Sequence, residues 1–204
     1  MLISKKRIWQ DRLQTARHFY PKFAPIDLCF GLIGLFMNPY RLCRKFLQKM
    51  GADNVYAYGE TPIMTYQRIV EQCEVRSSDV WIELGAGRGK GCFWLNRMVG
   101  CKVIGIEWIP SFVRIAKVLK KLFGLREIEF RCEDFEKTDL REGTIIYLYG
   151  NHPKIQIPEG LRVITMSEPL EGARVLKAFW VRFPWGRTTA YLQTFINDRN
   201  DQTR

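Results

Sequence analysis

The chain has 204 residues, enough for one domain with a substantial core and a short extension. Its 47% apolar content is that of a globular protein, and its basic start lacks the apolar stretch of a secretory signal. The six cysteines form no Cys-x-x-Cys pair, and with only two histidines the usual zinc spacings are excluded. We therefore expect reduced thiols, no metal site and a cytoplasmic location.

The net charge of +11 is concentrated at one end of the chain. Residues 1–50 carry ten Lys or Arg against two acids, whereas the remainder carries 22 against 19. Such a basic block can attract nucleic acid, an anionic membrane surface or an acidic protein, and charge does not choose among them. We expect a basic, partly apolar helical extension over residues 1–54 and a second domain over residues 55–204.

The extension combines an amphipathic pattern with an apolar run. Residues 4–20 predict a helix, which the two prolines of residues 21–25 end. Residues 28–37 are uncharged and apolar, with basic residues on both sides, but a membrane span needs about 20 residues. We interpret this run as a core or docking helix, with a peripheral membrane anchor, cations facing lipid head groups, as the alternative.

Beyond the extension, short apolar strands alternate with helical patterns. Thr61-Pro62 predicts a helix start, with Thr61 as the N-cap of a helix over residues 61–75. Further helices are expected over 89–99 and 110–123, and strands over 80–84, 102–108, 127–132, 144–149 and 161–166. This order predicts a parallel, doubly wound α/β sheet. Two final strands, 174–183 and 188–195, predict an antiparallel hairpin.

A glycine-rich loop follows the first expected strand. The dinucleotide pattern Gly-x-Gly-x-x-Gly fails in every register, and a phosphate loop fails because Gly91 follows Lys90. The pattern is an acid, Glu83, followed by glycines at alternate positions. It fits a cationic ligand without phosphate, since a carboxylate can hold an ammonium group and open amides can hold a carboxylate. The loop residues expected to bind are Gly85, Ala86 and Gly87.

The next two strands also end in acids. Glu107 lies 24 positions after Glu83, where it can accept hydrogen bonds from both hydroxyls of a ribose. Trp108 beside it packs either on an adenine or on the sheet. Asp134 is placed to bind an adenine amino group and Phe135 to stack on its ring, with a plain acidic loop as the alternative. Three such positions at matching strand ends indicate a ligand crevice.

Several segments together resemble a known family. They are Tyr58-Gly-Glu-Thr61, Glu83–Gly89, Gly105–Glu107, Glu133–Phe135, Tyr149-Gly-Asn151, Gly160–Val163 and the hairpin of residues 185–194. They are similar to the class I S-adenosylmethionine-dependent methyltransferases, and in detail to the non-SET, disruptor-of-telomeric-silencing type of protein lysine methyltransferase and its small membrane-associated relatives. The likeness implies S-adenosyl-L-methionine as cofactor and a Rossmann-like, mostly parallel seven-stranded sheet with a C-terminal antiparallel hairpin.

The resemblance also implies roles for individual residues. A loop made by Tyr58, Glu60 and Thr61 would close over the methionine end of the cofactor. The residues near the sulfonium or along a narrow channel for the acceptor amine would be Asn151, Tyr149 and Tyr191. The chain departs from the family at Glu83, Gly150 and Ala190, where Asp, Asn and Tyr are usual.

The chemistry of methyl transfer leaves the acceptor open. The reaction is an in-line displacement, so alignment and exclusion of water carry much of the rate, and an aromatic channel can keep a lysine amine neutral. We expect a protein lysine as acceptor. The alternatives are RNA or DNA, bound through basic residues 1–50, then a small molecule, and finally a cofactor-binding module without catalysis, which the intact loop disfavours.

Overall fold

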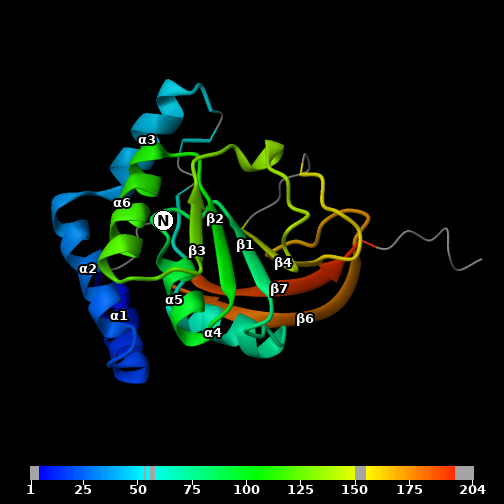
Figure 1. Ribbon diagram of the computed structural model, residues 1–204, viewed down its shortest axis with the longest axis horizontal. Coiled ribbons are helices and arrows are strands. Elements are labelled where there is room, and N and C mark those ends of the chain that lie inside the picture. The colour runs from blue at the N-terminus through cyan, green and yellow to red at the C-terminus, as the bar shows by residue number, and fades with distance from the viewer. Residues whose placement is uncertain (1–4, 53, 56–57, 150–154, 196–204) are drawn as a thin grey trace, which may run out of the picture.

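The computed structural model describes residues 5–52, 54–55, 58–149 and 155–195, and Figure 1 shows their arrangement. Seven strands form one sheet in the order β3-β2-β1-β4-β5-β7-β6. The first five are parallel, while β7 pairs antiparallel with both β5 and β6. The strands are β1 Val80–Leu84, β2 Lys102–Ile106, β3 Ile128–Arg131, β4 Ile145–Tyr149, β5 Arg162–Met166, β6 Arg174–Phe183 and β7 Gly186–Thr194. The seven-stranded sheet and its terminal hairpin confirm the expected fold class.

The two faces of the sheet are covered differently. Side chains on one face, such as Trp81 and Tyr147, join a large core to which α1, α2, α4, α5 and α6 all contribute. The opposite face, which includes Ile82 and Ile146, is covered by loop residues such as Leu140. Because both faces are buried, the central parallel strands are apolar almost throughout.

Three helices connect or precede the parallel strands: α4 Ile63–Gln72, α5 Lys90–Met98 and α6 Pro110–Leu122. The expectation that Thr61 caps α4 is wrong. The N-cap residue is Pro62, and the Thr61 hydroxyl lies 2.7 Å from the Tyr147 hydroxyl instead. Thr61 therefore makes a tertiary contact instead of capping the helix, and the helix begins after Pro62.

The N-terminal helices α1 Lys5–Phe19, α2 Ala24–Phe36 and α3 Pro39–Lys49 pack on the rest of the molecule (Figure 1). The Phe19 ring meets Trp94 edge-to-face at 5.5 Å, and the Phe30 ring lies 5.7 Å from that of Phe93. Phe23 is also fully buried in the same core. These helices share one core with the sheet, and a boundary at residue 54 stays a prediction about domain organisation.

Helix α3 was not anticipated from the sequence, although a local signal exists. The Asn38 side chain accepts a hydrogen bond from the Arg41 amide at 3.2 Å, and Pro39 occupies the first helical turn. Asn before Pro is a favourable helix start. The buried side of α3 contributes Cys43 to a small cluster with Phe112.

Candidate active site

The loop after β1 is shaped by glycines, of which Gly89 has the least freedom. Its φ is +83°, a left-handed conformation, and a Cβ there would lie 2.5 Å from Phe130 Cζ. The loop is further fixed to β2, because the amides of Gly85 and Ala86 both donate to the Ile106 carbonyl at 2.9 Å. The motif thus holds a rigid turn against the end of the neighbouring strand.

Glu107 ties this loop to the end of β2. Its carboxylate accepts the Gly87 amide at 2.7 Å and the Ile109 amide at 2.8 Å. Burial raises the pKa of the Glu107 carboxyl, and these two amides act in the opposite direction. A carboxylate has about four acceptor positions, so capacity remains for a ribose hydroxyl.

Glu83 lies at the end of β1 and is almost fully buried. One carboxylate oxygen accepts the Tyr66 hydroxyl at 2.7 Å, and the other accepts the Cys92 thiol at 3.6 Å. Burial raises the pKa of Glu83 to about 7, although these hydrogen bonds lower it. A cation beside Glu83 would favour its ionised form. The spacing of the sequence did not reveal Tyr66 and Cys92, since they come from α4 and α5.

The segment from Tyr58 to Thr61 contacts the glycine loop through Arg88. The Tyr58 hydroxyl donates to Glu60 at 2.5 Å, and Arg88 Nε donates to the same carboxylate oxygen at 3.0 Å. Burial acts to raise the pKa of Glu60, but the Arg88 guanidinium holds it below its ordinary value. At its other end, Thr61 contacts Tyr147 of β4. The segment therefore bridges the ends of β1 and β4.

Aromatic residues continue from this bridge. The Tyr149 ring lies 5.5 Å from Phe183, which stacks on Trp185 at 5.4 Å. They line a cavity of about 330 Å3 together with Glu60, Thr61 and residues of α2 and α3. Burial raises the pKa of both Tyr147 and Tyr149, so their phenols stay protonated at neutral pH. The cavity is an aromatic pocket next to the glycine loop.

Other expected site residues make contacts of their own. Asp134 accepts the Glu136 amide at 3.1 Å and caps a short 3-10 helix, Phe135–Lys137. Trp108 meets Phe46 of α3 edge-to-face at 5.3 Å. Tyr191 pairs with Thr165 of β5 and alternates with Leu192, which belongs to the helix-covered core, so its side chain faces the opposite side of the sheet from Tyr147. Asn151 lies outside the described residues.

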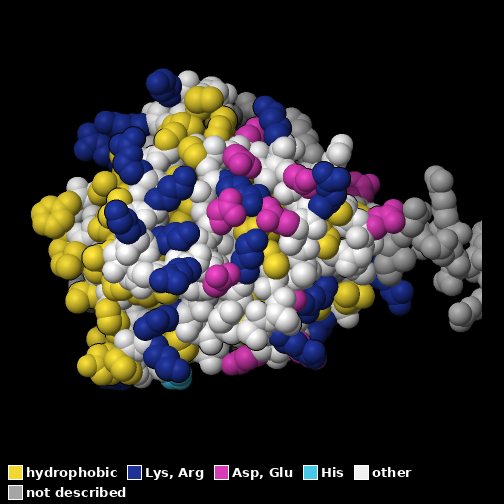
Figure 2. All heavy atoms as spheres, in the orientation of Figure 1, with side chains coloured by type: hydrophobic (Ala, Val, Ile, Leu, Met, Phe, Trp, Pro, Cys, Tyr) yellow, Lys and Arg dark blue, Asp and Glu magenta, His cyan; other side chains and the backbone are white. Residues whose placement is uncertain are grey.

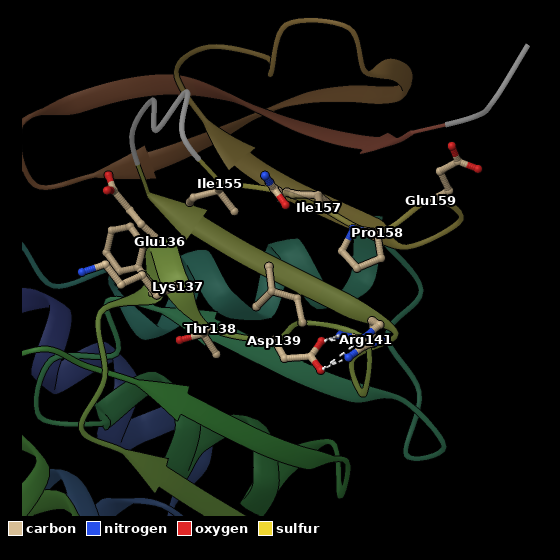
Figure 3. Close-up of a pocket in the computed structure, with 12 residues that line it drawn as sticks. Glu136, Lys137, Thr138, Asp139, Arg141, Ile155, Ile157, Pro158 and Glu159 are labelled. Atoms are coloured by element: carbon tan, nitrogen blue, oxygen red, sulfur yellow. Dashed lines mark hydrogen bonds and ion pairs between the residues drawn. The ribbon is translucent and has the colours of Figure 1, made fainter.

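A larger cavity, of about 570 Å3, lies on the loop-covered face of the sheet (Figure 3). Asp139 and Arg141 point toward one another at its edge and form an ion pair at 2.7 Å. Phe135 is the one expected site residue in its lining. It contains none of the acids that end β1 and β2, and the glycine loop remains the candidate site.

The residues around the loop fit S-adenosylmethionine chemically. Nothing lies within 4 Å of a Cβ built on Gly85, so the backbone there can be approached closely. Glu83, Gly85 and Tyr149 line one small cavity of about 40 Å3 with the Tyr58 to Thr61 segment over it. Glu83 and Glu107, the acids suited to an ammonium group and a ribose, lie at the ends of the neighbouring parallel strands β1 and β2. Within the described ranges, no three His, Cys, Asp or Glu side chains are grouped to hold a metal ion.

The family model for the histone methylation protein DOT1 matches residues 43–146 of this chain. The chain belongs to this family. The match begins in α3 and ends in β4, so it contains the glycine loop, Glu107 and the Tyr58 to Thr61 segment. Among curated proteins, no sequence matches the chain significantly.

Solved structures share the fold of this DOT1-family chain. An RNA methyltransferase from Salinibacter ruber in complex with S-adenosyl-L-homocysteine has a TM-score of 0.59 at 24% identity, over 72% of this chain and 100% of that one. A mutant of MtNAS in complex with S-adenosylmethionine has a TM-score of 0.57 at 11% identity, over 80% and 75%. A methyltransferase from Aquifex aeolicus described as SAM-dependent has a TM-score of 0.50 at 15% identity, over 63% and 89%. The fold is that of the class I methyltransferases.

Proposed function

We propose that this DOT1-family chain transfers methyl groups from S-adenosylmethionine to lysine side chains of a protein. The observation that carries the proposal is the bridge from Tyr58 to Thr61, which joins the glycine loop to an aromatic cavity. The family match supports a protein acceptor, since its described activity is histone methylation.

S-adenosylmethionine supplies a methyl group on a sulfonium, which leaves as a neutral thioether. On the donor side, Glu107 is placed to accept from the ribose hydroxyls, and Glu83 to balance the ammonium charge. Arg88 holds Glu60, and through it the bridge, over this end of the loop. These residues bind and align the donor, which is the main requirement of an in-line displacement.

On the acceptor side, the lysine nitrogen needs a free electron pair to form the new N–C bond. The rings of Tyr149, Phe183 and Trp185 provide an apolar wall that disfavours an ammonium ion and so lowers the pKa of an entering amine. The raised pKa of Tyr149 excludes a tyrosinate base at neutral pH. The amine therefore gives its proton to water as it enters, and the cavity keeps it neutral.

The proposal is tested by incubating the chain and labelled S-adenosylmethionine with an extract of the source cell. Label that protease removes and acid hydrolysis returns as methyl-lysine is the expected result. Label removed only by nuclease would contradict the lysine acceptor. The nucleic-acid alternative is favoured by the Salinibacter ruber neighbour and by the exposed Arg114 and Lys117 on α6.

We further propose that this protein is cytoplasmic and contacts a membrane peripherally through α2. Its exposed positions are one turn apart on one side of the helix, with exposed fractions of 64% at Leu28, 49% at Leu32, 76% at Leu35 and 92% at Phe36. Figure 2 shows apolar side chains along the edge where α2 lies, with Lys and Arg beside them. Asp27, the one acid of α2, is buried and lies 2.6 Å from Lys90. An apolar stripe beside cations suits an anionic lipid surface.

No helix of the described residues is long and apolar enough to cross a membrane. The proposed contact is measured by sedimentation with vesicles of phosphatidylcholine and phosphatidylserine. Leu35→Asp combined with Phe36→Asp should abolish binding, because both side chains are exposed and the fold does not depend on them. Leu176→Asp on β6 is the matched control. Equal binding by both variants would contradict a role of α2.

A further inference from the structure

A cavity of about 670 Å3 lies beside the aromatic cavity of the site, between α4 and the β6–β7 hairpin. Three arginines and two tryptophans line it: Arg68, Arg182, Arg187, Trp180 and Trp185. None of its lining residues is Asp or Glu. We call this cavity the Arg/Trp groove. Its charge is positive and its walls are partly aromatic.

Two of the three arginines, Arg68 and Arg187, are held in place by the Trp180 ring, without carboxylate partners. The guanidinium carbons of Arg68 and Arg187 lie 4.6 Å and 4.5 Å from the centroid of the Trp180 ring. Arg68 Nε also donates to the Trp180 carbonyl at 2.7 Å. No described Asp or Glu forms an ion pair with any of the three arginines. Positioned and uncompensated guanidinium groups are suited to binding an anion.

Two of these arginines oppose each other across the hairpin. Arg182 of β6 pairs in register with Arg187 of β7. Like charges directly opposite each other on antiparallel strands destabilise the pair. A carboxylate bound between the two guanidinium groups would relieve this repulsion.

The Arg/Trp groove adjoins the acceptor cavity. Phe183, Pro184 and Trp185 line both, and the Phe183 ring stacks on Trp185 with an interplanar angle of 18°. A chain lying in the groove could therefore send one side chain past this aromatic wall toward Tyr149. Residues near that side chain in sequence would remain beside Arg182 and Arg187.

We propose that the Arg/Trp groove binds aspartate or glutamate side chains that flank the acceptor lysine of the protein substrate. This inference rests on the proposed lysine acceptor and narrows it to lysines in acidic surroundings. Arginine binds carboxylates in a bidentate manner, and the partly aromatic walls suit the peptide chain. A nucleic acid fits less well, because bases need a free aromatic face for stacking and two guanidinium groups already cover the Trp180 ring.

The test is a binding measurement that does not depend on methyl transfer. A fluorescein-labelled twelve-residue peptide with one lysine among glutamates is compared by anisotropy with the same peptide carrying glutamines. The full chain should bind the glutamate peptide at least about tenfold more tightly, and more salt should weaken that preference. Arg182→Gln combined with Arg187→Gln should remove the preference.

Arg174→Gln is the matched control, since Arg174 is exposed at the other end of β6. This variant should keep the preference. Equal binding of both peptides by the wild type, or equal loss in the control, would overturn the proposal. Tighter binding of a twelve-nucleotide RNA, lost in the Arg182/Arg187 double variant, would overturn it in favour of a nucleic acid. A failure here, with methyl-lysine still formed in the extract, would leave the proposed function intact.

Discussion

The donor and acceptor sides of the site are built in different ways. On the donor side, backbone amides and the Glu107 carboxylate fix one continuous segment of chain against the next strand. On the acceptor side, Thr61, Tyr149 and Trp185 come from three distant segments and meet through side chains. The glycine loop is fixed by hydrogen bonds of its own backbone and tolerates few substitutions. The lining of the aromatic cavity comes from separate segments, so single residues in it can be replaced more freely. Substitutions should therefore have larger effects on the donor side.

The largest effect is expected at Gly89. Gly89→Ala adds a Cβ 2.5 Å from Phe130 Cζ and forces a left-handed φ on alanine. The free energy of unfolding should therefore fall by about 4 kcal/mol. Denaturation in urea measures this. Gly124→Ala is the control, because Gly124 has φ +63° with nothing within 4 Å of a Cβ, and should cost about 1 kcal/mol. Equal losses would mean that the contact with Phe130 relaxes freely.

The next largest effect should be a dependence of stability on pH through Glu83. Its pKa is about 7 in the folded chain against 4.5 ordinarily, so the folded state binds the proton more readily. The stabilisation is full below pH 4.5 and is lost as the pH rises through 7, by about 3 kcal/mol in all. Glu83→Gln should lack this loss, as denaturation at pH 5 and pH 8 would show. Parallel pH profiles for both proteins would contradict a protonated Glu83.

Binding of the donor should depend on Glu107. Glu107→Ala should lower the affinity for S-adenosylmethionine about 100-fold, below detection in ordinary calorimetry, because hydrogen bonds to a charged group are lost. Circular dichroism should still show a folded protein. Glu129→Ala, which changes an exposed carboxylate on β3, is the control and should bind normally. Unchanged affinity in Glu107→Ala would remove the ribose role from this residue.

A smaller effect is expected at the ion pair that joins the bridge to the glycine loop. Glu60→Gln leaves the buried Arg88 without its carboxylate and should cost about 2 kcal/mol of stability, a reduced value because Glu60 is partly exposed. Adding Arg88→Met should recover part of the loss. A double-mutant cycle by thermal denaturation measures the coupling, and additive losses would show that the two side chains act independently.

The smallest effect is expected at the contact between the bridge and β4. Thr61→Val keeps the shape of the side chain and removes its hydroxyl from Tyr147, so it should cost about 1 kcal/mol. Tyr147→Phe should cost a similar amount. Because both remove the same bond, the double variant should lose little more than either single one in urea denaturation. Fully additive losses would mean that each hydroxyl has another partner.

The sequence predicted the donor side better than the acceptor side for a physical reason. Glycine spacing and an acid at each strand end are local signals, and parallel pairing of β1 with β2 brings Glu107 to Gly87. Arg88 occupies a variable position of the motif, so its pairing with Glu60 depended on where a distant segment folds back. Strand register decides which side of the sheet Tyr191 faces, and a similarity of motifs does not predict that register.

The helical segments show the same difference between features that local sequence predicts and features that depend on distant contacts. Residues 4–20 were predicted as a helix from periodicity, and α1 Lys5–Phe19 confirms this. The apolar run of residues 28–37 was ambiguous because α2 has both buried and exposed apolar positions. Phe30 is buried against the core while Leu35 is exposed, a distinction that depends on which side of the helix meets α5. An apolar run in the sequence does not by itself predict which side of the helix makes that contact.

The shared core of the N-terminal helices also bears on how this chain could be divided. Phe19, Phe23 and Phe30 fill space against Phe93 and Trp94, so residues 55–204 expressed alone would present an uncovered apolar surface. The two pieces should instead behave as complementing fragments, each poorly soluble alone and able to reassemble when mixed. The shared core would then be restored only when both pieces are present.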